Sequence, residues 1–212
     1  MLMKEDIEMK LYLTLSLITL VLFCPLCPAP ASGAELHNIP LEWKPTETIS
    51  ALDAIDLTVF HNVKFIVKPF NDFRKRPEEI GKNVEKRGTN RILLVTTRDN
   101  VAAWLTDRFA KILEEFDIDV VKTGGTLVLD ADIVKFFVTE ESVYKADVAL
   151  KVRLKSPSGA VLWEGMTSSN ATRFGSSYKA ENYFEALSNA AISAVHALLR
   201  NEAFKQAVQK NK

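Results

Sequence analysis

The side chains best suited to chemistry in this sequence begin with two aspartates. Asp130 and Asp132 lie two positions apart in a stretch with strand-like alternation, so both carboxylates would face the same side of a sheet. Such a pair is compatible with an acid pair or with a cation site. Solvation on a strand explains the two residues equally well, and no second cluster of ligands supports a metal.

The histidines and glycines show no catalytic spacing. His37, His61 and His196 are all distant from another histidine or a cysteine at metal-ligand spacing. His196 falls in a helical pattern, where a structural role outweighs a catalytic one. Gly124-Gly125 lacks the flanking pattern of a phosphate loop, and no GxSxG motif is present. The sequence therefore favours a protein that is not an enzyme and has no cofactor or metal.

The chain has 212 residues with 27 basic and 27 acidic side chains, which suits one ordinary domain without a nucleic-acid signature. Residues 1–34 read as a signal peptide. Leu11–Phe23 is an uncharged apolar run, shorter than the about 20 residues that a spanning helix needs. Ala29–Ala31 or Ser32–Ala34 forms the cleavage box. The residues before Met9 are more acidic than a signal requires, so translation could begin at Met9; an uncleaved membrane anchor is the alternative.

Both cysteines lie in this leading segment. Cleavage after Ala34 removes Cys24 and Cys27, which leaves no disulfide and no thiol nucleophile. A lipobox needs a small residue directly before its cysteine, whereas Phe23 precedes Cys24 and Leu26 precedes Cys27. We therefore expect export without lipidation, with lipidation at Cys24 as the less favoured outcome.

The elements that position the polar residues centre on three long predicted strands, Leu127–Glu140, Ala146–Lys155 and Val161–Thr172. The second alternates apolar and polar residues with a period of two, which indicates one buried and one exposed face. The alternation in the first strand changes phase at Val134-Lys135, which predicts a β-bulge. A sheet of this kind must cover its apolar face with other elements.

Two amphipathic helices are predicted to cover that face. The first is expected to begin at an N-cap provided by Asp99 or Thr97, and the second to run from about Ala180 to Val208. Their apolar stripes are Val101, Trp104, Leu105, Phe109, Ile112, Leu113 and Phe116, and Phe184, Leu187, Ala191, Ala194, Val195 and Leu198. The expected fold is an α+β two-layer sandwich, with a mainly antiparallel sheet of four to five strands and two long helices on one face.

The rest of the chain divides into an arm and a domain. Residues 35–61 read as an extended arm whose Leu41 and Trp43 could dock on the body, and residues 62–212 as a single domain. Asn71–Asn90 reads as a long polar loop rich in basic residues. Loops of this length in compact domains are either functional or poorly ordered.

Several short motifs add a family resemblance. They are Asp72-Phe73-Arg74, Ile80-Gly81, Asp99 through Trp104, Asp132 through Val138, Arg173-Phe174-Gly175, Asn182-Tyr183 and Ala186-Leu187-Ser188. With the order of the elements, they resemble the uncharacterised bacterial envelope lipoproteins of the YajG type. The layout is more distantly similar to auxiliary lipoproteins of envelope transport and lipopolysaccharide assembly. The resemblance implies an envelope protein without known catalysis, tethered by a lipid, and supplies no catalytic residues.

The expected function is that of a non-catalytic interaction or accessory domain in the maintenance or transport systems of the cell envelope. The candidate interaction residues are Asp72, Arg74, Ile80 and Gly81 in the long loop, together with Arg173. The structural alternative is that Asp72 and Arg74 only tie the loop to the body. We expect another envelope protein as the partner, no nucleic acid, and a location in the periplasm with an association with the outer membrane left open. The alternative is a module that binds lipid or another apolar ligand between helices and sheet. Bulky aromatic residues predicted to face the core favour the first function.

Overall fold

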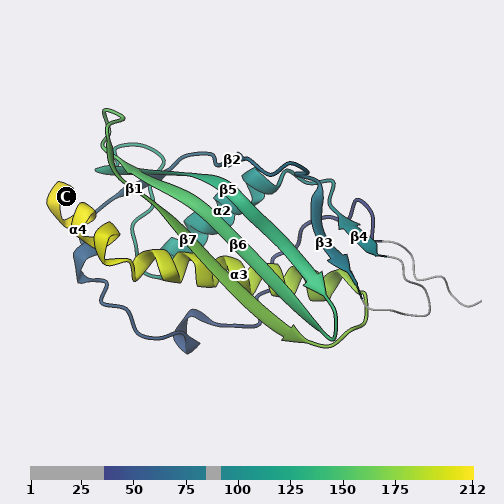
Figure 1. The fold of residues 1–212 in the computed structure, drawn as a ribbon. Helices are drawn as coiled ribbons and strands as arrows, with labels where there is room; N and C mark the ends of the chain where they lie inside the picture. Colours follow the sequence, from purple (N-terminus) through teal and green to yellow (C-terminus); the bar gives the residue numbers. More distant parts are fainter. Residues whose placement is uncertain (1–35, 85–91) are drawn as a thin grey trace, which may run out of the picture. The chain divides into compact units, whose positions relative to one another are not determined.

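The computed structural model describes residues 36–84 and 92–212, which form one open sheet with helices packed against it (Figure 1). The strands are β1 (Phe65–Val67), β2 (Asn71–Asp72), β3 (Glu79–Asn83), β4 (Leu93–Thr96), β5 (Leu127–Glu140), β6 (Val143–Lys155) and β7 (Val161–Phe174). The helices are α2 (Val101–Glu115), α3 (Ala180–Leu199) and α4 (Glu202–Asn211), with single 3-10 turns at Ile49–Ala51 and Thr58–Phe60. The predicted signal peptide, with both cysteines, lies outside the described residues.

The sheet is built around the long antiparallel β5–β6–β7 meander, and its strand order is β4-β3-β5-β6-β7. Three short strands, β1, β2 and β3, follow one another along the free side of β5 and run parallel to it. The predicted α+β sandwich with a mainly antiparallel sheet is confirmed. The sheet has seven strands because short segments before α2 join it. The predicted bulge is also present, as a register shift between Ile133 and Lys135.

The core lies between one face of the sheet and the helices. Alternate side chains of β6 are buried from Tyr144 to Leu154, and Figure 1 shows α2 and α3 on the same side of the sheet. The predicted stripe of α2 is buried except for Trp104, which is half-buried and lies edge-on to Phe136 with ring centroids 5.7 Å apart. The opposite face of the sheet carries cross-strand ion pairs such as Lys151–Glu164, 2.9 Å between charged atoms.

Two predicted helix boundaries are wrong. The N-cap of α2 is Asn100, whose side chain accepts a 2.9 Å hydrogen bond from the amide of Ala103. Asp99 is not the cap because its carboxylate accepts the amide of Leu41 instead. The second helix does not continue to Val208 but ends at Leu199. Asn201 then caps α4 by accepting a 3.0 Å hydrogen bond from the amide of Phe204.

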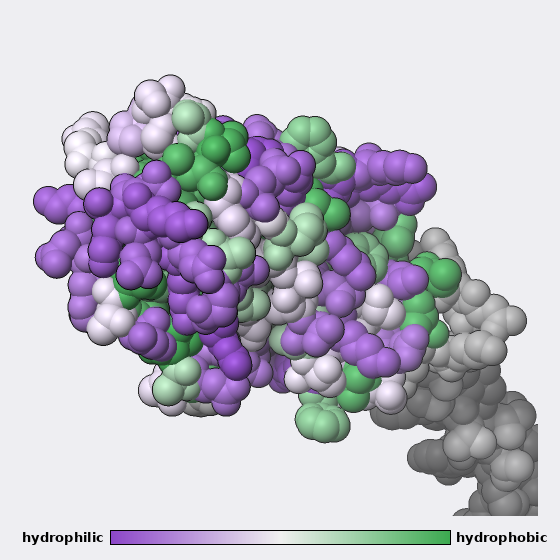
Figure 2. Space-filling view, turned by 60° about the vertical axis from the view of Figure 1, so that its left-hand side comes forward, coloured by the Kyte–Doolittle hydropathy of each residue, from purple (hydrophilic) through white to green (hydrophobic). Residues whose placement is uncertain are grey.

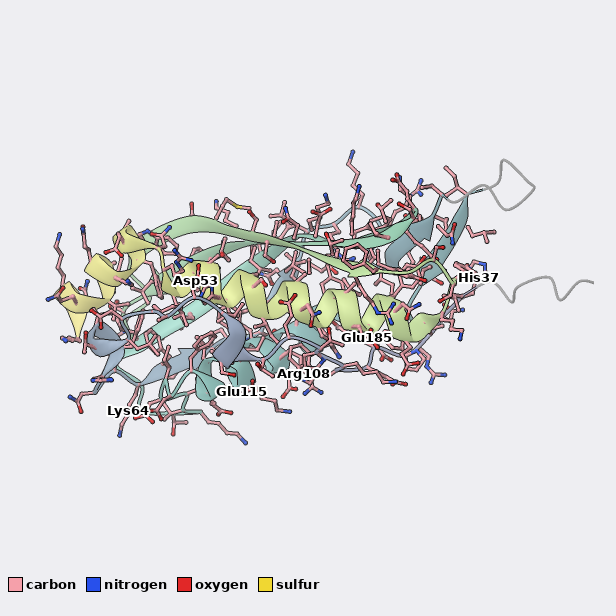
Figure 3. All side chains as sticks on the ribbon, turned by 90° about the horizontal axis from the view of Figure 1, so that it is seen from below. His37, Asp53, Lys64, Arg108, Glu115 and Glu185 are labelled. Carbon is pink, nitrogen blue, oxygen red and sulfur yellow. The ribbon has the colours of Figure 1, made fainter. Side chains whose placement is uncertain are left out.

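The arm from residue 36 to residue 61 is docked along the body. Leu41 is buried, and Trp43 lies 5.9 Å from Trp104 between ring centroids, with Arg108 over both rings. Farther along the arm, Asp53 pairs with Arg200 at 2.9 Å, and Figure 3 shows Asp53 beside α3. The arm therefore contacts both long helices, α2 through Trp104 and α3 next to its C-terminus.

The expected loop at Asn71–Asn90 is wrong for its described part, because β2 and β3 lie there. The sequence hides these strands: they are short, and charged residues interrupt their apolar positions. Within β3, Ile80 and Asn83 are buried between β4 and β5. Residues 85–91 lie outside the described part of the chain.

Candidate functional site: a groove beside Phe73

An open groove of about 700 Å³ lies between the β2–β3 connection and the N-terminus of α2. It is lined by residues 70–73, 77–78 and 97–102, so it contains Asp72, one of the predicted interaction residues. The lining combines apolar side chains such as Phe70 and Val101 with charged ones such as Glu78 and Arg98. Such a surface suits a polypeptide with both apolar and polar groups.

Phe73 is an aromatic side chain presented to solvent at this groove. It is 70% exposed, although its own amide donates a 3.1 Å hydrogen bond to the carbonyl of Ile133 in β5. Val134, which lies in the bulge of β5, is 51% exposed. Figure 2 shows that hydrophobic residues on the displayed face occur in small separate groups among hydrophilic ones. Phe73 is therefore an exposed aromatic residue at the edge of the groove.

Arg74 holds the backbone around Phe73 in place. Its side chain is only 8% exposed and forms a bidentate pair with Asp72, at 2.9 Å from Nε and 2.6 Å from Nη2. The guanidinium also donates to the carbonyls of Glu79 at 2.9 Å, Phe136 at 3.1 Å and Pro77 at 2.5 Å. These charge-assisted bonds link both ends of the β2–β3 connection to β5. Phe73 is consequently an exposed side chain on a fixed backbone.

The other predicted interaction residues have packing or pairing roles in this structure. Ile80 is fully buried, and a Cβ added to Gly81 would lie 2.7 Å from Cε1 of Tyr183 and 2.9 Å from the carbonyl of Val138. Both are packing positions in β3, away from any surface that a partner could reach. Arg173 of β7 forms an ion pair with Glu185 of α3. The interaction role of Asp72, Arg74 and Arg173 stays a prediction.

Asp130 and Asp132 are paired with cations of the chain itself. Arg153 of the neighbouring strand bonds Asp130 at 2.5 Å and Asp132 at 2.6 Å and 2.8 Å, and Lys155 pairs with Asp130. The Arg153 guanidinium lowers the pKa of the Asp132 carboxyl below its usual value, and a hydrogen bond from Asn71 acts in the same direction. Cross-strand ion pairing thus accounts for the two carboxylates. In the described ranges, no three His, Cys, Asp or Glu side chains gather as a metal site.

A buried carboxylate at the end of β5 escaped the sequence reasoning. Glu140 is inaccessible to solvent and accepts hydrogen bonds from the hydroxyls of Tyr144 at 2.8 Å and Tyr183 at 2.7 Å, and from the amide of Tyr178 at 2.8 Å. Burial raises the pKa of the Tyr183 hydroxyl well above its usual value, and the bond to Glu140 raises it further. Asn182 donates to Tyr144 at 3.0 Å. The closed network stabilises the junction of β5, β6 and α3.

His196 has a structural role, as its helical position predicted. Its Nε2 lies 2.9 Å from the carbonyl oxygen of Asp53 in the arm, and its ring stacks on Phe116 with centroids 6.2 Å apart. The contact joins α3 to the docked arm. No helix within residues 36–84 and 92–212 is long and apolar enough to cross a membrane.

No protein family model and no curated protein sequence matches the chain. Among solved structures, it is similar to protein XCC0632 of Xanthomonas campestris, of the DUF330 family, with a TM-score of 0.51 and 13% identity over 76% of this chain and 92% of that one. Weaker likeness is found to PelC of Paraburkholderia phytofirmans, crystallised as a dodecamer (TM-score 0.37, 16% identity, 65% and 86% covered). It is also found to lipoprotein GNA1162 of Neisseria meningitidis (TM-score 0.27, 17% identity, 55% and 88% covered). The chain therefore shares the fold of XCC0632.

Proposed function

We propose that this protein is a non-catalytic accessory protein of the bacterial cell envelope that binds a partner protein through the groove beside Phe73. Export is supported by the leading apolar segment and its small-residue cleavage box. The observation that carries the binding function is the exposure of Phe73 between two residues that are locked to the body, Asp72 and Arg74.

The physical reason is pre-organisation. Aromatic side chains in well-packed pockets supply a large part of the binding free energy of protein interfaces. A side chain whose backbone is already ordered loses less conformational entropy when a partner covers it. Phe73 is an exposed aromatic side chain on an ordered backbone, because Arg74 fixes that backbone, and the groove next to it offers apolar and hydrogen-bonding contacts to a partner.

The packing between helices and sheet favours this function over storage of an apolar ligand. Aromatic rings fill that layer: Phe70 lies edge-on to Phe109 at 5.2 Å, and Trp104 edge-on to Phe136 at 5.7 Å, between ring centroids. Close-packed side chains of this kind leave little volume for a second molecule. A native mass spectrum of the exported protein tests this point, because a bound lipid would add a defined mass.

The binding proposal is tested by capture of partners from envelope extracts with the exported protein as bait. Phe73→Ala should abolish capture of a specific partner and leave the melting temperature unchanged, because the side chain is 70% exposed. Ile92→Ala, at an apolar residue that is 57% exposed in another part of the surface, is the matched control and should retain capture. The captured protein is then purified, and its affinity for the unchanged protein, for Phe73→Ala and for Ile92→Ala is measured by titration. Equal affinity for the Phe73→Ala variant would exclude the groove as the binding site.

Export is tested separately, by N-terminal sequencing together with labelling by a fatty acid. We expect an unlabelled protein that begins at Glu35, because Phe23 and Leu26 precede the cysteines where a lipobox needs a small residue. A labelled protein that begins at Cys24 or Cys27 would show instead a lipid tether.

A further inference from the structure

The two edges of the described sheet differ sharply. The β4 edge is four residues long, and the docked arm covers it: the amide of Ile39 donates to the carbonyl of Thr96, and the amide of Thr96 donates to the carbonyl of Leu36, both at 3.0 Å. At the opposite edge β7 extends over 14 residues and pairs with β6 on one side. No other described segment forms backbone hydrogen bonds with its outer side. Figure 1 shows β7 as the last strand of the sheet.

An edge of this length is unusual unless residues that prevent strand pairing protect it. Natural edges are commonly blocked by lysine, proline, inward-pointing charges or a bulge. Val161–Phe174 contains no lysine and no proline. Its two charged side chains are both already paired, Glu164 with Lys151 and Arg173 with Glu185. The register shift in β7 falls only at its start, next to Leu162. The strand is therefore open to another strand along most of its length.

The side chains on the open face of β7 indicate which strand would fit. Three of them are large, apolar and exposed: Val161 at 55%, Met166 at 52% and Phe174 at 84%. The register shift puts Val161 opposite Lys155, on the same face as Glu164, so the exposed apolar residues lie at both ends and near the middle of one row. A row with apolar ends and a small polar centre at Ser168 matches itself when it is reversed.

We propose that two copies of this chain form a two-fold symmetric dimer in which β7 of one copy pairs antiparallel with β7 of the other, with the axis at Ser168. This register uses the whole strand. The facing pairs on the open side are Ser168 with Ser168, Met166 with Asn170, Glu164 with Thr172, and Val161 with Phe174. No like charges lie opposite each other. The exposed apolar residues at the two ends of the strand, Val161 and Phe174, each cover the other one in the second copy.

Neighbouring registers fit less well. Moving the axis by one residue toward the C-terminus sets the carboxylate of Glu164 against Phe174, which would remove a charge from water beside an aromatic ring. Moving it by one residue toward the N-terminus leaves Phe174 beyond the end of the partner strand. Side-chain alternation excludes axes midway between residues, because they would bring open-face residues against core-face ones.

The part of α3 beneath this edge exposes only small residues. Hydroxyl groups of Thr167 and Ser169 donate to the carbonyls of Ala194 and Ala190, at 2.7 Å and 2.5 Å, which holds α3 close under β7. In the adjoining half of α3, the accessible positions are small residues such as Ser193 and Ala197. The accessible positions in this half of α3 therefore carry no long side chain.

Sedimentation velocity of the exported protein over a range of concentrations tests the proposal. The unchanged protein should show a monomer–dimer equilibrium. Ser168→Lys places two ammonium groups against each other at the axis and should raise the dimer dissociation constant at least tenfold. Thr172→Lys, at another exposed site on the same row, places its ammonium opposite Glu164 of the second copy and should preserve or strengthen the dimer. Thermal melting of both variants checks that the monomer fold is intact.

Cross-linking checks the register independently of affinity. In the full chain with Cys24 and Cys27 replaced by serine, Ser168→Cys should form a disulfide-linked dimer on mild oxidation, because directly opposite residues are within bonding range. Met166→Cys should couple to Asn170→Cys in mixed samples, and Ser158→Cys, in the exposed β6–β7 turn, should not cross-link. A monomer at every concentration would overturn the proposal. So would an assembly that Ser168→Lys leaves intact, or a preference for cross-linking outside this register.

Discussion

The hydroxyl of Tyr183 on α3 donates a 2.7 Å hydrogen bond to the buried carboxylate of Glu140 at the end of β5. The same carboxylate accepts hydrogen bonds from the hydroxyl of Tyr144 in β6 and from the backbone amide of Tyr178. Three donors thus converge on one side chain that has no contact with water. Removal of a charge from water without such partners would be strongly destabilising, so the arrangement holds together only as a complete set.

Glu140→Gln should therefore destabilise the protein by roughly 1–3 kcal/mol. The substitution replaces one accepting carboxylate oxygen with an amide nitrogen, which cannot accept, so one of the buried donors around Glu140 loses its acceptor. The free energy of unfolding is measured by urea denaturation. Glu141→Gln, at the adjacent exposed position, is the control and should change stability by less than about 0.5 kcal/mol. Equal effects of the two substitutions would mean that Glu140 is not buried in solution.

Periodic signals made the centre of this fold predictable. The alternation in β5 and β6 located both strands, and its change of phase at Val134 located the bulge. Glu140 also had a signal in the sequence, because it continues the inward row of Phe136 and Val138 with a period of two. Its partner Tyr183 lies 43 positions away along the chain, however, and no local pattern connects the two residues.

Tertiary contacts decided what the sequence could not. Asp99 and Asn100 both have side chains that commonly cap helices. The choice between them depends on Leu41, far away in the chain, because its amide donates a hydrogen bond to the Asp99 carboxylate and leaves Asn100 as the cap. Likewise, the backbone around Phe73 is held in part by the hydrogen bond from Arg74 to the carbonyl of Phe136, which lies 62 positions away in the chain. The sequence identified Asp72 and Arg74 as notable residues but could not show that the aromatic residue between them is exposed.

Leu198→Ala should cost roughly 2–5 kcal/mol, the usual range for an emptied leucine site. Leu198 of α3 is buried in the same core against which Trp104 of α2 packs, so its removal leaves a cavity between the helices and the sheet. Urea denaturation measures the loss, with the exposed Ala197→Gly as a control for helix propensity of about 1 kcal/mol. A loss below about 0.5 kcal/mol for Leu198→Ala would contradict the packing of α3.

The ion pairs of β5 predict that the free energy of unfolding depends on pH in the acidic range. Because Arg153 lowers the pKa of Asp132 in the folded protein, the unfolded chain binds a proton there at higher pH than the folded one. The stabilisation is present above the unfolded pKa of about 4 and is lost as the pH falls below it. Asp132→Asn should therefore flatten the curve of unfolding free energy against pH below about pH 4. An unchanged curve would show that the pair is not formed in solution.

Arg74→Ala tests the link between the clamp and the exposed aromatic residue. The Arg74 side chain is 8% exposed, and its removal takes the guanidinium donors away from the carboxylate of Asp72 and from the carbonyls of Glu79 and Phe136, so we expect a loss of roughly 1–3 kcal/mol. Arg76→Ala is the matched control, because its side chain is 68% exposed and pairs with Glu79. It should change stability by less than about 1 kcal/mol.

The two arginine variants also separate stability from binding. Partner capture by Arg74→Ala, measured at a temperature where the variant is still folded, should fall as it does for Phe73→Ala, because the backbone that presents the ring is no longer fixed. Arg74→Lys should recover only part of both properties, since an ammonium group cannot reproduce the bidentate pair with Asp72. Full capture by a destabilised but folded Arg74→Ala protein would show that pre-organisation of Phe73 is not needed for binding.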